Sequence, residues 1–452
     1  MHVDRWGQEA TTDRPDAVLA LEAATLAFLA HDRSTPDHMA ACFAADPDLP
    51  LAHAAKGLMC KLQALGCHET NAAAALAAAR AGIEARGATA RERGYVEALA
   101  AWCAGDWWRA IDHLDRVLVG APGDPMAIKT AQIARFMLGD LDGMRRSVES
   151  VLPAWDEERD GYGYLLGCQA FTLEETGETR AAEATGRHAV ALEPRDAWGL
   201  HAVAHVMETE GRPEDGIAWL SSKQAAWAHC NNFGFHVWWH WALFMIDAGE
   251  PDGVLELYDT RIRPNPTDDY RDIANGASIL WRLEALGLPV GERWAELADL
   301  AERHGDEHLL VFADAHYLTA LVGAGRLAAA DAFVASARAA ARRGETTQIR
   351  LAGDLGLALL QVIREAGQAG AGATIDRLAP LLPALHRIGG SHAQRDVFVQ
   401  LFVDAALTAG RPEAARAALA ARHAHRGAPG LWGADRQRRA DALAGSDALD
   451  IT

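Results

Sequence analysis

The chain has 452 residues, half of them hydrophobic, and a formal net charge of -19. This negative charge excludes a protein that binds nucleic-acid phosphates through a basic surface. No uncharged apolar run reaches the roughly 18 residues that suggest a membrane span, and residues 1–15 lack the apolar core of a signal peptide. The six cysteines form no CxxC pair. We therefore expect a cytoplasmic protein with reduced thiols.

Apolar residues with helical periodicity fill residues 16–445, and β-branched runs of alternating polarity are absent, so we predict an all-α fold. The clearest signal is a recurring glycine at the predicted end of a helix. The series is Gly105, Gly139, Gly177, Gly211, Gly249, Gly287 and Gly325, and it continues less regularly through Gly367 and Gly410. We predict one repeat domain over residues 16–445, an N-terminal segment 1–15 and a C-terminal tail 446–452. The stretch GQAGAGATID (367–376) is the candidate joint.

The regular part of this series has intervals of 34 or 38 residues. A glycine after a helix adopts the left-handed conformation at little cost, which suits the turn between two antiparallel helices. Small residues stand five positions after several of these glycines, namely Ala110, Ala182, Ala330 and Ala415. A 34-residue unit of this kind is typical of the tetratricopeptide repeat. We predict a tetratricopeptide-like superhelix in which the first helix of each pair lines the concave surface.

Two pairs of histidines occur at a spacing of four residues, His201 with His205 and His236 with His240. His236 and His240 lie thirteen and nine residues before Gly249, whereas His205 lies six residues before Gly211. These spacings place the three rings on one helical face. His201 lies slightly to one side of this face of the helix, by about the angle between two consecutive residues.

Other polar residues stand at the same distances before their turn glycines. Tyr164 and Cys168 lie thirteen and nine residues before Gly177, and His316 lies nine before Gly325. Asn232 is one turn before His236 in a helix that is otherwise apolar. Because buried polar groups must be hydrogen-bonded, we expect this stripe to face a concave cavity.

Three interpretations of the stripe remain open. The histidines can be core residues whose hydrogen bonds are satisfied by packing neighbours. They can bind a metal, although Glu208 follows His205 in the order His-x-x-Glu, which matches neither the di-iron nor the zincin pattern. They can act without metal as acids, bases or hydrogen-bond donors to a small anionic or carbonyl-containing ligand. Cys168 is better explained as a buried, inert thiol than as a nucleophile.

The segment IGGSHAQRDVF (388–398) begins another predicted helix. Ser391 and Gln394 have the spacing of a capping box. Arg395 is unfavourable for the helix dipole at this position, so we expect it to be held for a carboxylate partner, either Asp396 or a ligand. An ion pair between repeats is an equally good explanation.

The segments HAVAHVMETEGR, HVWWHWALF and GGSHAQRDVF together make the chain resemble the tetratricopeptide repeat protein 38 family over nearly its full length. The resemblance implies an all-helical tetratricopeptide-like superhelix and entails no particular reaction. The positions carried over from the family are His201, His205, Glu208, His236, Trp239, His240, Trp241, Gly390, Ser391, Gln394, Arg395 and Asp396. His392 departs from a fixed pattern and is not counted in the site.

We predict a histidine-lined concave pocket for a small molecule, without a metal or other cofactor. The predicted catalytic residues are His205, His236 and His240, one of which would transfer a proton, and Glu208, which would orient a histidine. The predicted ligand-binding residues are His201, Asn232, Trp239, Tyr164, His316, Arg395, Asp396 and Gln394. The alternatives are a scaffold that binds a peptide or protein, and a His/Glu metalloprotein. The sequence leaves open whether the protein is an enzyme and whether it self-associates.

Overall fold

The structure is a computed structural model that describes residues 1–366 and 371–449. Its helices confirm the all-α prediction, since the strands of the described residues are confined to one short antiparallel pair near the N-terminus. Among the described residues, no helix is both long enough and apolar enough to cross a bilayer. The chain forms two compact units, residues 1–206 with 223–234, and residues 207–222 with 235–452, which we describe separately.

The first unit begins with the predicted N-terminal segment, which contains the strand pair. Trp6 is buried and donates its Nε1–H to the Asp160 carbonyl, and Arg5 pairs with Glu22. The elements of this unit are β1 (His2–Val3), β2 (Glu9–Ala10), α1 (Pro15–Leu29), α2 (Thr35–Ala45), α3 (Pro50–Lys61), α4 (Gly66–Arg86), α5 (Ala90–Cys103), α6 (Trp107–Gly120), α7 (Pro125–Leu138), α8 (Leu141–Val151), η1 (Leu152–Ala154), α9 (Tyr162–Glu175), α10 (Thr179–Leu192), the greater part of α11 (Ala197–Thr209), and η2 (Gln224–Ala226).

The second unit takes the end of α11 and most of α13. Its elements are α12 (Pro213–Ser221), α13 (Phe233–Asp247), η3 (Pro251–Gly253), α14 (Val254–Leu257), the π-turn η4 (Tyr258–Ile262), α15 (Tyr270–Ala285), α16 (Arg293–Arg303), α17 (Val311–Gly323), α18 (Leu327–Ala341), α19 (Thr347–Leu351), the π-turn η5 (Ala352–Gly356), α20 (Leu357–Glu365), α21 (Gly372–Leu378), η6 (Ala379–Ile388), α22 (His392–Thr408), α23 (Pro412–His425) and α24 (Gly430–Leu449).

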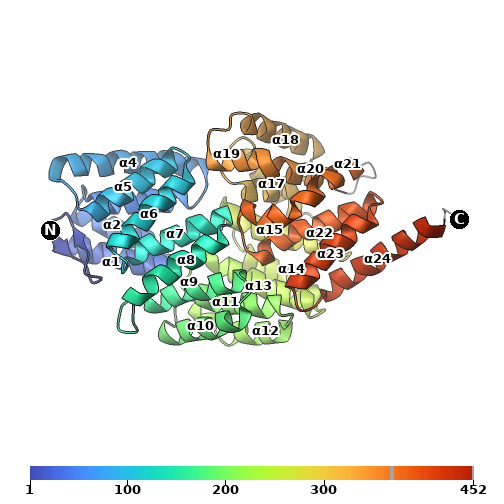
Figure 1. Ribbon diagram of the computed structural model, residues 1–452, viewed down its shortest axis with the longest axis horizontal. Helices are drawn as coiled ribbons and strands as arrows, with labels where there is room; N and C mark the ends of the chain where they lie inside the picture. The colour runs from blue at the N-terminus through green and yellow to red at the C-terminus, as the bar shows by residue number, and fades with distance from the viewer. Residues whose placement is uncertain (367–370, 450–452) are drawn as a thin grey trace. The chain divides into compact units, whose positions relative to one another are not determined.

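Consecutive helices pack in pairs within each unit, as in α5 with α6, α9 with α10, and α22 with α23 (Figure 1). The predicted turn glycines account for these hairpins. All of those in the described residues have positive φ, for example +87° at Gly177 and +67° at Gly211. Residues 367–370, which include Gly367 and the start of the candidate joint 367–376, lie outside the described residues.

Small side chains let the paired helices approach each other, as the sequence predicts. The alanines five positions after the turn glycines, Ala110, Ala182, Ala330 and Ala415, have no solvent exposure. The capping box at the start of α22 is also confirmed. Gln394 N–H donates to Ser391 Oγ, and the Gln394 side chain accepts from the Ser391 N–H.

Candidate functional site

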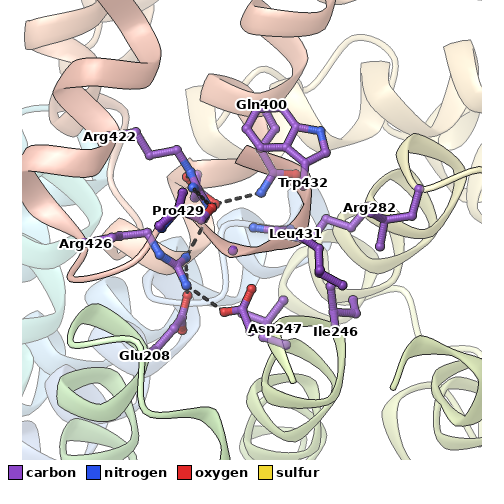
Figure 2. Close-up of a pocket in the computed structure, with 14 residues that line it drawn as sticks. Glu208, Ile246, Asp247, Arg282, Gln400, Arg422, Arg426, Pro429, Leu431 and Trp432 are labelled. Carbon is purple, nitrogen blue, oxygen red and sulfur yellow. Dashed lines mark hydrogen bonds and ion pairs between the residues drawn. The ribbon is translucent and has the colours of Figure 1, made fainter. Parts of the chain in front are cut away.

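A small open cavity lies in the second unit, with about 20 Å³ of room for the centres of water-sized molecules and about 450 Å³ of empty space when the solvent at its mouth is included (Figure 2). The end of α11, the helices α13, α15, α22 and α23, and the start of α24 contribute to its wall. The lining residues are Glu208, Leu243, Ile246, Asp247, Arg282, Leu286, Asp396, Gln400, Arg422, Arg426, Pro429, Gly430, Leu431 and Trp432. Six of these fourteen residues are charged, so the wall combines apolar side chains with more charge than the largely apolar wall of a typical small-molecule site. Of the predicted site residues, Glu208 and Asp396 line this cavity.

The loop between α23 and α24 closes one side of the cavity. It is anchored to the end of α11 by a hydrogen bond from the Gly427 N–H to the Thr209 carbonyl, 2.7 Å long. Arg426, in the same loop, donates to Glu208 Oε1 at 3.2 Å and to Asp247 Oδ2 at 2.7 Å. These contacts fix both the guanidinium and the Glu208 carboxyl at the cavity wall, as Figure 2 shows.

Glu208 faces the cavity on one side and a histidine on the other. His240, which is fully buried and not among the lining residues, places Nδ1 3.3 Å from Glu208 Oε2. Its ring packs edge-on against His236, whose Nδ1 lies 2.9 Å from Asn275 Oδ1. The sequence-based prediction made histidine the proton-transfer group and Glu208 its orienting partner. The structure places the carboxyl, rather than the imidazole, at the cavity.

Burial dominates the electrostatics of this pair. It raises the pKa of Glu208 above its usual range, against the charges of Arg426 and Arg282. Burial lowers the pKa of His240 well below its usual range, with His236 and Arg282 adding to the effect. Burial also lowers the pKa of His236, to about 4. Both imidazoles are therefore neutral near pH 7, and the Glu208 carboxyl is the group of this set whose proton affinity is increased.

Asp396 belongs to a tightly paired part of the cavity wall. Arg422 donates to its two oxygens at 2.6 and 3.0 Å, and Gln400 donates to Oδ2 at 2.8 Å. Burial alone would raise the pKa of Asp396, but the charge and hydrogen bonds of Arg422 hold it below its usual range. Bidentate pairing of this kind satisfies both partners. Asp396 is thus a structural anion, paired with Arg422 rather than with its neighbour Arg395.

Arg282 is paired differently. It is 4% exposed, and its hydrogen bonds go to neutral acceptors: Nη1 donates to the carbonyl and Oγ of Ser278, and Nη2 donates to the Ala393 carbonyl. Trp239 lies under the guanidinium, with 5.7 Å between Cζ and the ring centroid, and donates its own Nε1–H to Ser278 Oγ. Among the described residues, Arg282 forms no ion pair within 4.0 Å, and its hydrogen bonds use Nη1 and Nη2 but not Nε. Burial lowers the pKa of Arg282. The negative charges of Asp396 and Glu208, which do not contact the guanidinium directly, raise it but do not offset the effect of burial.

The first unit brings His201 and His205 together with two glutamates that the sequence-based prediction missed. The Nε2 atoms of the two histidines are 2.9 Å apart, and His205 Nδ1 lies 3.6 Å from Glu174 Oε2. Glu174, Glu175 and His205 each place a potential ligand atom within 4.8 Å of the others. Their exposed fractions are 0%, 3% and 1%, and that of His201 is 2%.

The remaining predicted site residues lie elsewhere. Tyr164 packs against Leu29 and Ala30 in the first unit, and Asn232 lies in the turn that precedes α13 rather than on the face of that helix. His316 is enclosed by Phe312 and Phe398, with Nδ1 2.8 Å from the Phe312 carbonyl.

Three further predicted positions serve the framework. Gln394 completes the α22 cap, and Arg395 donates to the Gly390 carbonyl and contacts His392. Trp239 supports Arg282, and none of these three residues lines the cavity.

Ser336, His308 and Asp314 form a hydrogen-bonded chain in the second unit that has the connectivity of a catalytic triad. His308 Nε2 is 3.0 Å from Ser336 Oγ, and its Nδ1 is 3.0 Å from Asp314 Oδ2. Ser336 lies in the interior of α18, however, where backbone N–H groups donate within the helix and none is free to stabilise an oxyanion. We interpret the chain as a structural link between α17 and α18.

A second cavity lies in the first unit, and it contains an arginine, Arg91, that is paired with carboxylates. Arg91 lines it and lies 3.1 Å from Asp4 Oδ2 and 2.6 Å from Asp124 Oδ2, with Tyr95 also donating to Asp124. Its charge is compensated by direct contact. Arg282 differs because its positive charge has no such partner in the cavity that it lines.

Comparison with known families adds no assignment, since no protein-family model matches the chain. One of the missed residues had a signal in the sequence. Glu174 lies three residues before Gly177, as Glu208 lies three before Gly211, so the two occupy the same position in consecutive repeats. Arg282 had no comparable signal, because an arginine in an amphipathic helix is ordinarily a surface residue.

Proposed function

We propose that the protein binds a small molecule through a carboxylate group in the cavity of the second unit, with Arg282 as its counter-ion. The observation that carries the proposal is the buried guanidinium without a carboxylate partner. The Nε–H makes no hydrogen bond within the described protein, and a guanidinium can present neighbouring N–H groups that a carboxylate accepts in a bidentate manner. Leu243, Ile246 and Trp432 would contact the apolar part of the ligand.

Glu208 would be the second polar contact to this ligand. The cavity wall contains three arginines, Arg282, Arg422 and Arg426, and three carboxyl groups, Glu208, Asp247 and Asp396. If a ligand carboxylate is added, the negative charges in the cavity outnumber the positive charges, unless one of the three carboxyl groups takes up a proton. Burial already raises the pKa of Glu208, so the bound ligand would face a protonated, hydrogen-bond-donating Glu208. This arrangement requires neither a metal nor another cofactor in the second unit.

The test uses the full chain and a panel of small acids, acetate, oxalate, malonate and succinate, with sodium chloride at equal ionic strength as the reference. A ligand at a hundred times its dissociation constant should stabilise the fold by about 2.7 kcal/mol, which thermal unfolding detects. Arg282→Met should weaken binding at least about tenfold, because a charge-assisted hydrogen bond contributes about 1.5–3 kcal/mol.

Arg293→Met is the matched control, because Arg293 pairs with Asp259 at the surface of the same unit and is absent from the cavity. It should bind each acid as the unmodified chain does. Stabilisation by no acid beyond the chloride reference would contradict the proposal, as would an Arg282→Met variant with undiminished binding.

We further propose that the helical hairpins belong to a tetratricopeptide-like superhelix of the kind found in the tetratricopeptide repeat protein 38 family. The turn glycines at intervals of 34 and 38 residues, each with positive φ, support this proposal. An experimental structure tests it, because successive hairpins should stack with a constant rotation from one to the next. A globular bundle without such a rotation would contradict it.

A further inference from the structure

The last turn of α9 concentrates negative charge in the interior of the first unit. Glu174 and Glu175 are its final two residues, both are buried, and this turn contains no basic residue. The carbonyl groups at a helix C-terminus already carry partial negative charge, so carboxylates are unfavourable there. A bound metal ion is one of the partners that stabilise buried carboxylates. A divalent cation at this end of α9 would interact favourably with both carboxylates and with the helix carbonyl groups.

His205 adds a nitrogen donor to the two carboxylates. Its Nδ1 lies 3.6 Å from Glu174 Oε2, which is longer than the roughly 2.7–3.2 Å of an N–H···O hydrogen bond. Two ligand atoms about 2.0–2.1 Å from a tetrahedral ion are about 3.3–3.4 Å apart. The observed separation exceeds that of a direct hydrogen bond and is compatible with two ligands of one ion. Glu175 supplies the third ligand atom, within 4.8 Å of the other two.

His201 is placed to orient His205. If Nδ1 of His205 binds an ion, its Nε2 carries the proton and donates to His201 Nε2 at 2.9 Å. Metal-binding histidines generally use their second nitrogen in this way, which fixes both tautomer and ring direction. Phe171 packs edge-on against His205 and stacks on His201, so both rings are held in place.

We propose that Glu174, Glu175 and His205 bind a divalent transition-metal ion, with His201 as the positioning residue. Oxygen and imidazole donors without thiolate suit Zn²⁺, Mn²⁺ and Fe²⁺. Two carboxylates and one neutral imidazole balance the charge of the ion. Three protein ligands leave one tetrahedral position for a further ligand such as water. This site lies in the first unit and does not depend on the carboxylate site proposed above.

Metal binding is tested on the full chain after treatment with a chelator. Calorimetric titration with Zn²⁺, and separately with Mn²⁺, should give one equivalent of bound ion. Glu174→Gln, Glu175→Gln and His205→Gln should each weaken binding at least tenfold. A surface pair provides matched controls: His188 Nε2 lies 3.3 Å from Glu157 Oε1 in the same unit. His188→Gln and Glu157→Gln should leave the affinity unchanged.

His201→Asn separates a positioning role from a purely structural one. This variant should retain one site but bind Zn²⁺ about 10–100-fold more weakly, and it should shift the visible absorption of the Co²⁺-substituted protein. Circular dichroism establishes that each variant is folded. For the unmodified chain, X-ray absorption of bound Zn²⁺ should show oxygen and nitrogen ligands only, a result that needs no variant.

Three results would overturn the proposal. They are failure of the unmodified chain to bind Zn²⁺ or Mn²⁺, sulfur in the coordination sphere, and wild-type affinity in a folded Glu174→Gln/Glu175→Gln double variant. The last result would show that the two glutamates are not ligands and that any bound ion is held by histidines alone.

Discussion

Glu208 Oε2 lies 3.3 Å from His240 Nδ1, and the same relationship occurs one repeat earlier, where Glu174 Oε2 lies 3.6 Å from His205 Nδ1. Both glutamates stand three residues before a turn glycine. In both cases a carboxyl group near the end of one helix, α9 or α11, lies close to an imidazole of the next helix but one, α11 or α13. The two copies differ in their surroundings. Glu208 also meets Arg426 and a cavity, whereas Glu174 lies beside a second buried carboxyl.

Carboxylate affinity should increase as the pH falls. Because burial raises the pKa of Glu208, and a bound carboxylate would raise it further, binding is coupled to proton uptake. The affinity should rise by at most about tenfold per pH unit, and calorimetry in two buffers of different ionisation enthalpy should show the proton. Oxalate is the suitable ligand above pH 5, because it stays ionised there. Glu208→Gln should remove the dependence, and an affinity that falls with decreasing pH would contradict the assignment.

Removal of the Asp396 charge should strongly destabilise the fold. Asp396→Asn leaves Arg422 without its buried partner, a change that costs about 3–5 kcal/mol when a buried pair is broken. Asp259→Asn, which breaks the exposed pair with Arg293, should cost less than about 1 kcal/mol. Urea unfolding at pH 7 measures both variants. Equal losses would show that burial of the Asp396–Arg422 pair has no energetic consequence.

The same ion pair has a predictable pH dependence. The pKa of Asp396 is lower in the folded protein than the usual value of 3.8, so its contribution is present above that value. The contribution should be lost as the pH falls below about 4. In Asp396→Asn this part of the acid destabilisation should be missing, which unfolding series between pH 5 and 3 would reveal.

Much of the fold was predictable because the turns have a simple chemical requirement. Glycine is favoured where φ is positive, so Gly177, Gly211 and Gly249 correctly predict the turns that end three helices. The cap at Ser391 and Gln394 was predictable for a similar reason, since both hydrogen bonds are local. Local rules of this kind depend only on neighbouring residues.

The candidate site was predictable only in part because its partners come from distant segments. Helical spacing correctly put His201 beside His205 and His236 beside His240, but it could not show that Arg422 and Arg426 face Glu208 and Asp396. A shared helical face also did not mean a shared cavity, since His316 is enclosed by aromatic rings.

Buried neutral histidines should make the protein sensitive to mild acid. Burial lowers the pKa of His316 to about 4, from 6.5 when exposed. The unfolded chain therefore binds this proton more readily, so stability should fall as the pH decreases from about 6.5 to 4, by about 3 kcal/mol for this one group. His236 should behave in the same way.

His316→Phe tests this source of acid sensitivity. At pH 7 the variant should lose about 1 kcal/mol, because the hydrogen bond with the Phe312 carbonyl is removed. At pH 4.5 it should be more stable than the unmodified chain, because no proton is gained on unfolding at this position. Chemical denaturation at the two pH values measures the crossover, and parallel losses at both would contradict it.

The turn glycines provide a way to separate backbone strain from the support of the carboxylate site. A Cβ at Gly177, where φ is +87°, meets nothing within 4 Å, so Gly177→Ala should cost about 1–2 kcal/mol for the left-handed backbone alone. At Gly211, where φ is +67°, the added Cβ would lie 2.9 Å from Cβ of Ala428 in the loop that carries Arg426. Gly211→Ala should therefore cost more in urea unfolding and also weaken carboxylate binding, whereas Gly177→Ala should leave binding unchanged. Equal effects of the two substitutions on binding would show that the position of this loop does not control the site.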